Sequence, residues 1–363
     1  MSVRPLRIGK RLIGGEQPCF VIAEAGVNHN GDPAMARQLV DVAAAAGADA
    51  VKFQTFDPAL LVTASAPKAA YQQRNDGNTR SQREMLEALV LPRELHHELR
   101  SRAEAKGMMF LSSPFDEGSA DFLADLGVPA LKVASGELTN HLLLAHLAAK
   151  HLPLLVSTGM ATLDEIAAAL AALQAAGNRD VALFHCVSNY PCAPEEANLR
   201  AMATLRERFG LPVGWSDHTL GIDVSIAAVA MGAELLEKHF TLDRTLPGPD
   251  HKASLEPGEL HALVRGVRNV EAARGTGEKR PTASETAVAL VARRSLHYRT
   301  ERPAGHVVTR AALQALRPGD GVSPAKLNEI VGRALVKPVS AGARLALADL
   351  GPAADSAGKE AKS

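Results

Sequence analysis

Apolar runs recur along the first 240 residues of this chain, and polar side chains follow nearly every run. Alanine-rich stretches that favour helices separate the runs, and strands alternating with helices indicate crossover units of a parallel sheet. The polar residues that follow the eight runs are, in chain order, Glu24; Lys52 and Gln54; Ser112 and Ser113; Lys132; Ser157 and Thr158; His185; Ser216, Asp217 and His218; and Glu237, Lys238 and His239. Eight strands that aim polar groups at one rim predict a (β/α)8 TIM barrel, whose active site lies at that rim.

The spacers between the runs have the length and the end signals of barrel helices. We expect helices over 33–46, 92–106, 117–126, 142–150, 163–176, 198–208, 223–231 and 257–273. Glycines such as Gly47 and Gly127 follow these stretches, and glycine suits a left-handed helix C-cap. Eight repeats in about 250 residues match the usual size of this barrel. A doubly wound sheet is the rival fold, but no G-x-G-x-x-G follows the first strand.

Changes in composition and in hydrophobic periodicity divide the chain into five segments. Residues 1–19 indicate an N-terminal cap or hairpin, and residues 20–275 form the predicted barrel. A linker is expected over 276–290, where the periodic pattern breaks. Residues 291–353 predict a small, turn-rich domain with little helix, and the small, charged residues 354–363 predict a disordered tail.

Charge and composition exclude several classes of function. Forty Lys and Arg balance forty Asp and Glu, so no global field favours nucleic acid as a partner. No run approaches the length of a membrane span, and the first twenty residues show no signal peptide, so no membrane partner is expected. Cys19, Cys186 and Cys192 are too few and too scattered for a disulfide framework. We therefore expect a reduced, cytoplasmic enzyme.

Two histidines close neighbouring strands of the predicted barrel. His218 ends the seventh strand and His239 ends the eighth, so both imidazoles would lie at one rim. Imidazole suits borderline transition metals, and oxygen donors such as Asp217, Glu237 and Asp250 would suit Mn²⁺ or Mg²⁺. The pair therefore predicts a divalent metal site, and two hydrogen-bonded histidines without metal are the alternative.

Two lysines at strand ends indicate a binding site for a small anion. Lys52 and Lys132 follow buried runs and point towards the rim. The lysines would neutralise charge while serine hydroxyls donate to phosphate oxygens. A Schiff-base nucleophile and a snorkelling strand-end lysine are the alternatives. The serines expected in this anion cradle are Ser113, Ser135, Ser157 and Ser216.

Further candidates lie on the loops of the same rim. Glu24 ends the first strand and could transfer a proton or align a water, and a salt bridge to Lys52 is compatible with either role. The proline-rich run 247–254 carries Asp250, which could meet a polyol, although a rigid turn is an equal interpretation. The long polar stretch 63–82 is expected to be functional, because loops of that length in compact domains usually are.

Taken together, the motifs resemble the sialic acid synthase family, from about residue 5 to residue 352. The matching segments are IAEAGVNHNGD at 22–32, KFQT at 52–55, SSPFD at 112–116, LKVASGE at 131–137, STGM at 157–160, HCVSNYP at 185–191, GWSDHT at 214–219, EKHFT at 237–241 and GPDHKAS at 248–254. RRSL at 293–296 and LRPGDGVSP at 316–324 resemble the antifreeze-like (SAF) domain of the same synthases.

The resemblance implies a reaction and a set of residue roles. Family members condense phosphoenolpyruvate with an N-acylated mannose-type sugar, in a metal-dependent reaction that cleaves a C–O bond. Phosphoenolpyruvate would be held by Lys52, Ser113, Lys132, Ser135, Ser157, Ser188 and Ser216. The sugar or the reacting centre would be met by Glu24, Gln54, Tyr190, Glu237 and Asp250. Catalytic roles are expected for Glu24, Glu237, Lys52 and Lys132.

The resemblance also implies a metal and a quaternary structure. His218 and His239 would bind the divalent ion, with Mn²⁺ first and Mg²⁺ or Co²⁺ as alternatives. In relatives the small domain caps the barrel of the partner subunit, which implies a domain-swapped homodimer with Arg317 reaching the sugar's N-acyl group. An Asn in the loop 75–81 would also hold the sugar, and we assign it to Asn78, with Asn75 as the alternative.

The acceptor sugar is taken to be N-acetylmannosamine, which makes the chain an N-acetylneuraminate synthase. The nearest alternative is an N,N'-diacetyllegionaminate synthase that uses 2,4-diacetamido-2,4,6-trideoxymannose. A pseudaminic acid synthase is less favoured, because of AEAGVNHN at 23–30. A Schiff-base aldolase would need no metal, and a non-catalytic sugar- or ice-binding protein would leave the polar rim without a purpose.

Overall fold

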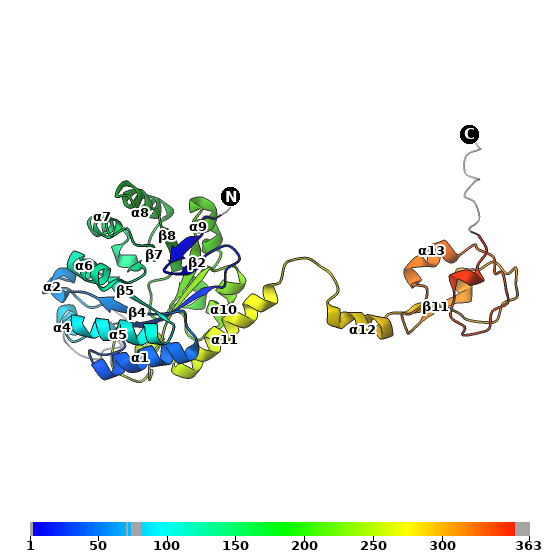
Figure 1. The fold of residues 1–363 in the computed structure, drawn as a ribbon, viewed down its shortest axis with the longest axis horizontal. Helices are drawn as coiled ribbons and strands as arrows, with labels where there is room; N and C mark the ends of the chain where they lie inside the picture. The colour runs from blue at the N-terminus through cyan, green and yellow to red at the C-terminus, as the bar shows by residue number, and fades with distance from the viewer. Residues whose placement is uncertain (1–2, 70–71, 74–80, 353–363) are drawn as a thin grey trace. The chain divides into compact units, whose positions relative to one another are not determined.

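The computed structural model describes residues 3–69, 72–73 and 81–352 and divides into two compact units. The first unit ends at Thr276 and the second begins at Gly277. Figure 1 shows the first unit as a barrel of strands ringed by helices. Across the described ranges, no helix combines the length and the apolar composition that crossing a membrane requires.

Eight parallel strands close into a barrel, in the order β10-β3-β4-β5-β6-β7-β8-β9, which confirms the predicted fold. The strands are β3 (Phe20–Gly26), β4 (Ala50–Thr55), β5 (Met109–Pro114), β6 (Leu131–Val133), β7 (Leu154–Ser157), β8 (Val181–Cys186), β9 (Val213–Asp217) and β10 (Leu235–His239). The first strand of the barrel pairs with the last, so no strand edge is left open.

The helices between the strands match the expected ranges to within three residues. They are α1 (Pro33–Ala46), α5 (Arg93–Ala105), α6 (Glu117–Leu126), α7 (His141–Ala148), α8 (Leu163–Ala175), α9 (Ala201–Phe209), α10 (Asp223–Ala230) and α11 (Pro257–Arg274). Local signals explain this agreement. Asp32 caps α1 by accepting from the Ala34 N–H, Pro33 begins it, and Gly47 ends it at φ 81°.

Side chains along each barrel strand alternate between two environments. Outward residues such as Val21 and Phe53 pack against the helices in one large core. Inward residues such as Phe20, Leu155 and Phe184 form a second apolar cluster inside the barrel. Further along the same strands the inward positions become polar, so the apolar layer forms the floor beneath the C-terminal rim.

The N-terminal hairpin closes the other end of the barrel. β1 (Leu6–Ile8) and β2 (Arg11–Ile13) pair antiparallel. Leu6, Ile8 and Ile13 join the apolar cluster inside the barrel. Their burial removes apolar surface from water at the end of the barrel that carries no polar rim.

The described part of the segment between β4 and α5 includes the short helices α2 (Pro58–Leu61) and α4 (Gln82–Glu87). Ser81 and Glu84 form a capping box at the start of α4. Apolar side chains from this segment form a small separate cluster with Val27 and Phe115. These helices therefore flank the stretch 63–82 that was expected to be functional, and residues 70–71 and 74–80 of that stretch lie outside the described residues.

The second unit is small and has its own core. It contains α12 (Ala283–Ala292), a two-stranded antiparallel sheet of β11 (Ser295–Tyr298) and β12 (Leu313–Leu316), and α13 (Leu327–Ile330). Its core comprises Leu296, Tyr298, Val308, Leu313, Ile330, Leu335, Leu345 and Leu350. α12 begins inside the segment expected to be a linker, and a capping box of Thr282 and Glu285 starts it. The predicted tail 354–363 lies outside the described residues.

A matched pair of glycine substitutions tests the packing inside the barrel. A Cβ on Gly214 would come within 2.5 Å of the Leu235 carbonyl oxygen, whereas one on Gly258 in α11 would meet nothing within 4 Å. We expect Gly214→Ala to lower the free energy of unfolding by about 1–3 kcal/mol through overpacking. Gly258→Ala should raise it by about 0.4–1 kcal/mol. Urea unfolding measures both, and equal stabilities would contradict the packing described.

Candidate active site

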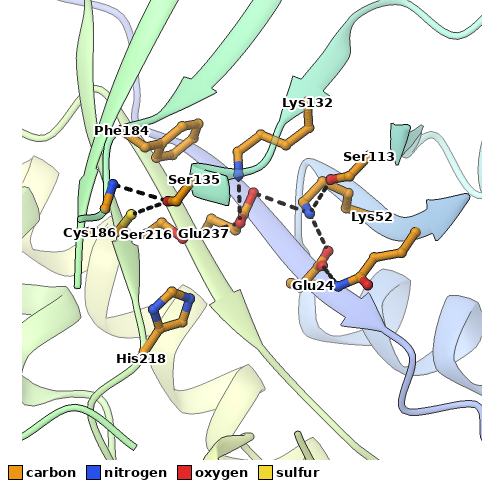
Figure 2. A network of polar contacts seen from close by, with 12 residues as sticks. Glu24, Lys52, Ser113, Lys132, Ser135, Phe184, Cys186, Ser216, His218 and Glu237 are labelled. Carbon is orange, nitrogen blue, oxygen red and sulfur yellow. Dashed lines mark hydrogen bonds and ion pairs between the residues drawn. The ribbon is translucent and has the colours of Figure 1, made fainter. Parts of the chain in front are cut away.

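Four charged side chains form a buried ion chain at the C-terminal rim of the barrel (Figure 2). Lys52 Nζ lies 2.8 Å from Glu24 Oε2 and 3.7 Å from Glu237 Oε2. Lys132 Nζ lies 3.2 Å from Glu237 Oε1. The buried ion chain therefore runs Glu24, Lys52, Glu237, Lys132, and none of these residues is more than 4% exposed. The sequence predicted all four, and the structure brings them together.

Hydroxyl and amide groups add hydrogen bonds to the buried ion chain. Lys52 donates to Ser113 Oγ at 3.0 Å, and Ser216 Oγ donates to Glu237 Oε1 at 3.2 Å. The Gln54 side-chain amide lies 3.5 Å from Glu24 Oε1. Each of these residues occupies an inward position on its strand. Buried charges are normally paired and hydrogen-bonded; here both carboxylates are ion-paired, while Glu24 Oε2 and Glu237 Oε2 have no hydrogen-bond partner among the described residues.

The two carboxyls have opposite electrostatic surroundings. Burial, only partly offset by Lys52, raises the pKa of Glu24 to about 7. Burial also acts to raise the pKa of Glu237, but Lys132 and Lys52 outweigh it and hold that pKa at about 2. Glu237 is therefore a permanent counter-ion, whereas Glu24 exchanges a proton near neutral pH. Two carboxyls whose pKa values are pushed apart have the character of an acid–base pair.

A pocket of hydroxyls lies beside the lysines, around the STGM and HCVSNYP segments. Ser135 Oγ accepts from the Gly159 N–H at 3.0 Å and lies 3.2 Å from Cys186 Sγ. A Cβ on Gly159 would stand 2.3 Å from Ser188 Oγ, so only glycine fits against this pocket. Ser157 Oγ is buried and has no hydrogen-bond partner among the described residues. The pocket thus holds hydroxyl groups ready for an anion.

His218 and His239 lie side by side, with ring centroids 5.5 Å apart. His218 Nδ1 donates to the Val187 carbonyl at 2.6 Å, which leaves its Nε2 with a lone pair. His239 Nδ1 is buried without a hydrogen-bond partner in the described structure. Burial lowers the pKa of His218 to about 4 and that of His239 well below its usual range, so both rings are neutral.

These features fit a divalent metal ion, because neutral imidazoles with a free nitrogen are metal ligands. Asp250 Oδ2 lies 4.0 Å from His239 Nδ1, and burial raises the pKa of Asp250 to about 6. Within residues 3–69, 72–73 and 81–352, no group of three His, Cys, Asp or Glu side chains could hold a metal. An ion held by two imidazoles would keep positions open for water or substrate, as catalytic sites do.

The structure corrects the expected set of oxygen donors for the metal. Asp217 points away from the cavity and accepts hydrogen bonds from Thr219 and Ser225. Glu237 is engaged by the lysines. Of the three expected oxygen donors, only Asp250 is left as a candidate metal ligand. The alternation of side chains along a strand separates Asp217 from Ser216 and His218, and this signal was present in the sequence.

The site residues line one cavity of about 480 Å³. Tyr190 lies over the histidines, with its ring centroid 4.0 Å from that of His218. One side of this cavity is apolar, which the sequence analysis missed. We call it the apolar wall, and it consists of Val27, Phe56, Leu61, Val62, Met85, Leu86, Leu89 and Phe115. Gly159, which borders the hydroxyl pocket, was missed as well.

The lining of this cavity does not test two of the predicted substrate-binding residues. Asn78 lies outside the described residues, and so does its alternative, Asn75. Arg317 belongs to the second unit, where its side chain is exposed. The contribution of these residues to sugar binding stays a prediction.

The fold and the site define a (β/α)8-barrel enzyme with a buried lysine–carboxylate centre. The chain belongs to the NeuB family, which matches residues 39–279, and residues 293–351 match the SAF domain. The expected family and the expected small domain are thereby confirmed.

Two curated relatives and one solved structure illustrate the similarity. The N,N'-diacetyllegionaminic acid synthase of Legionella pneumophila is 47% identical over 92% of this chain and 94% of its own length. The enzyme of the same name from Campylobacter jejuni is 43% identical over 88% of this chain and 96% of its own. The N-acetylneuraminic acid synthetase of Leptospira borgpetersenii, solved with citrate, superposes with a TM-score of 0.69 at 35% identity, over 79% of this chain and 95% of that one.

The titration of Glu24 gives a direct test of the site. Because the pKa of Glu24 is raised to about 7, its protonated-carboxyl band in the infrared spectrum should fade as the pH rises through neutrality. Glu24→Gln should abolish the component that fades near pH 7 and leave a component from Asp250, whose pKa burial raises to about 6. Glu98→Gln, at a surface carboxyl whose pKa Arg37 lowers, should leave both components unchanged. A component that still fades near pH 7 in Glu24→Gln would show that a group other than Glu24 titrates there.

Proposed function

We propose that this enzyme condenses phosphoenolpyruvate with the open-chain form of an N-acylated mannose-type sugar, giving a nine-carbon acid and phosphate. One observation carries the proposal: two buried lysines and a hydroxyl pocket lie beside two neutral histidines in a single cavity. Phosphoenolpyruvate carries two anionic groups and needs fixed cations and donors. The names of the relatives in the NeuB family support the same reaction class.

The ion chain supplies the binding energy for the anion. Lys52 and Lys132 already lie together in a buried site, so little reorganisation is needed when a phosphate or carboxylate arrives. Each lysine ammonium has three N–H donors, so it can bond ligand oxygens and keep its glutamate contact. Ser135, Ser157 and Ser188 donate to the same ligand, and Gly159 leaves room for it. The held anion is thereby positioned for attack on the sugar.

We assign the divalent ion to His218 and His239, with Asp250 as the nearest carboxylate. When bound, the ion supplies Lewis-acid polarisation of the sugar aldehyde. The protein's part is to keep both imidazoles neutral and oriented. The hydrogen bond from His218 Nδ1 to the Val187 carbonyl fixes that ring and presents its Nε2. Mn²⁺ is our first choice, with Mg²⁺ and Co²⁺ as alternatives.

The reaction balances with one water. The methylene carbon of phosphoenolpyruvate forms a C–C bond to the aldehyde carbon, and the aldehyde oxygen becomes a hydroxyl. Water adds to the cationic C2, and the tetrahedral intermediate then loses phosphate as its C–O bond breaks. We assign the water's proton to Glu24, because Glu237 is fixed as a charged counter-ion by Lys132 and Ser216. A carboxyl with a pKa near 7 is well matched to that task.

The apolar wall bears on which sugar is accepted. N-acetylmannosamine has one acetamido methyl and a C6 hydroxymethyl group. The diacetamido trideoxy sugar has two acetamido methyls and a C6 methyl. Burial against Leu61, Met85 and Leu86 stabilises apolar groups, whereas a hydroxyl in direct contact with these side chains loses water and gains no hydrogen bond from them.

We therefore propose 2,4-diacetamido-2,4,6-trideoxymannose as the preferred acceptor and N-acetylmannosamine as the second candidate. The sequence analysis ranked these sugars in the opposite order. The names of the relatives that are 47% and 43% identical support the new ranking. The swapped homodimer, with Arg317 reaching the partner's active site, stays a prediction that the oligomeric state in solution would test.

Phosphate release with each sugar tests the proposed function. With phosphoenolpyruvate and Mn²⁺ present, we expect kcat/KM for the diacetamido trideoxy sugar to exceed that for N-acetylmannosamine about tenfold. A small apolar group that contacts an apolar pocket typically changes kcat/KM between two substrates by about that factor. EDTA should abolish release with both sugars. Faster turnover of N-acetylmannosamine would make the enzyme an N-acetylneuraminate synthase. No release with either sugar would refute the proposed reaction.

Neighbouring leucines offer a matched test of the apolar wall. Leu61 lines the cavity, whereas Leu60 is 67% exposed on the same short helix. Leu61→Gln should reduce the preference for the diacetamido trideoxy sugar roughly tenfold, since it places an amide against the apolar groups. Leu60→Gln should leave the ratio of the two kcat/KM values unchanged. If both variants behave alike, the apolar wall does not select the sugar.

A further inference from the structure

A second buried ion pair lies behind the two histidines, on the helix side of the barrel. Asp217 and Lys238 are direct neighbours in the register of β9 and β10. Lys238 Nζ lies 3.0 Å from Asp217 Oδ2, and the two residues are 1% and 0% exposed. Their sequence neighbours His218 and His239 face into the barrel, so this pair points outward between the strands and the helices.

The hydrogen bonds of this pair form a closed network. Asp217 Oδ1 accepts from the N–H and the hydroxyl of Thr219, each at 2.8 Å. Asp217 Oδ2 accepts from Ser225 Oγ at 2.5 Å as well as from Lys238. Lys238 also donates to the Thr219 carbonyl. The network therefore connects β9, β10, the loop after β9 and the start of α10.

The network holds the backbone around each imidazole. In the sequence, His218 lies between Asp217 and Thr219, which are hydrogen-bonded to each other. His239 directly follows Lys238. The Cys192 N–H donates to the His218 carbonyl at 2.8 Å, which fixes the same segment from another loop. A shift of either strand end would move one histidine relative to the other.

Stability alone does not account for this pair. Burying two charges costs several kcal/mol in desolvation, and well-packed apolar residues often stabilise a core as well or better. An ion pair with four defined hydrogen bonds fixes the geometry of the strand ends that carry it. Metal sites depend on such outer contacts, which commonly change metal affinity about 10- to 100-fold.

We propose that the Asp217–Lys238 pair is a positioning device, which holds His218 and His239 at the separation that one divalent ion requires. This inference rests on the proposed metal role of the two histidines. Neither residue of the pair lines the described cavity, so both act through the strands and not by touching a ligand.

The test removes both charges together in Asp217→Asn/Lys238→Met, so that no unpaired charge is left buried. The Kd for Mn²⁺ is measured without substrate, from the electron paramagnetic resonance signal of the free ion. We expect it to rise about 10- to 100-fold. The Kd for phosphoenolpyruvate, measured by calorimetry without metal, should stay within about twofold, because Lys52 and Lys132 are untouched.

Two controls separate positioning from general damage. Asp49→Asn breaks ion pairs with Arg11 and Arg268 elsewhere in the barrel, so it should lower Tm but leave the Mn²⁺ Kd unchanged. His218→Ala and His239→Ala should abolish Mn²⁺ binding. If the histidine variants bind Mn²⁺ like the wild type, the metal site itself is wrong. If they lose the ion while the folded double variant keeps it within about twofold, the positioning role alone is refuted.

A milder variant covers the case in which the double variant does not fold. Thr219→Val removes only the hydroxyl that donates to Asp217 Oδ1 and nearly preserves the side-chain volume. We expect a smaller rise in the Mn²⁺ Kd, about threefold to tenfold, for the loss of one buried hydrogen bond. An unchanged Kd in folded Thr219→Val would overturn the proposal.

Discussion

The structure depends on one constraint: side chains alternate along eight parallel strands that close on themselves. Closure sends every second side chain into a shared interior, and the position along the strand then decides its chemistry. The lower inward positions are apolar and fill the barrel, as Phe20 and Phe184 do. The inward positions nearer the C-terminal rim are polar, and Glu24, Lys52 and Glu237 among them are charged. The apolar layer excludes water beneath the charges and raises the strength of every interaction among them.

The ion chain gains its properties from balanced charge. Two lysines and two glutamates compensate one another in the buried site, so folding does not require a ligand to neutralise it. The balance is uneven in detail, because Lys132 and Lys52 hold Glu237 charged while Glu24 is left with a raised pKa. An arriving anion competes for lysines that are already desolvated. The cost of desolvation is therefore met in folding and not in binding.

The sequence predicted the barrel and most of the polar rim, because a polar residue that ends an apolar run is a local signal. The same signal does not tell Ser216 from Asp217, since the side each faces depends on strand alternation within the closed barrel. The apolar wall was missed for another reason. Val27, Phe56 and Met85 come from separate segments of the chain, and only the folded chain brings them together. The different behaviour of Glu24 and Glu237 depends on interatomic distances that no sequence pattern contains.

The N-terminal hairpin determines where ligands enter and leave the barrel. Because Leu6, Ile8 and Ile13 fill one end of the barrel, ligands must come and go through the opposite end. The anion that binds the lysines has to enter the cavity first, before a second substrate binds near Tyr190 and the apolar wall. The order in which the two substrates bind is therefore set by their depth in the cavity and not by their relative affinities.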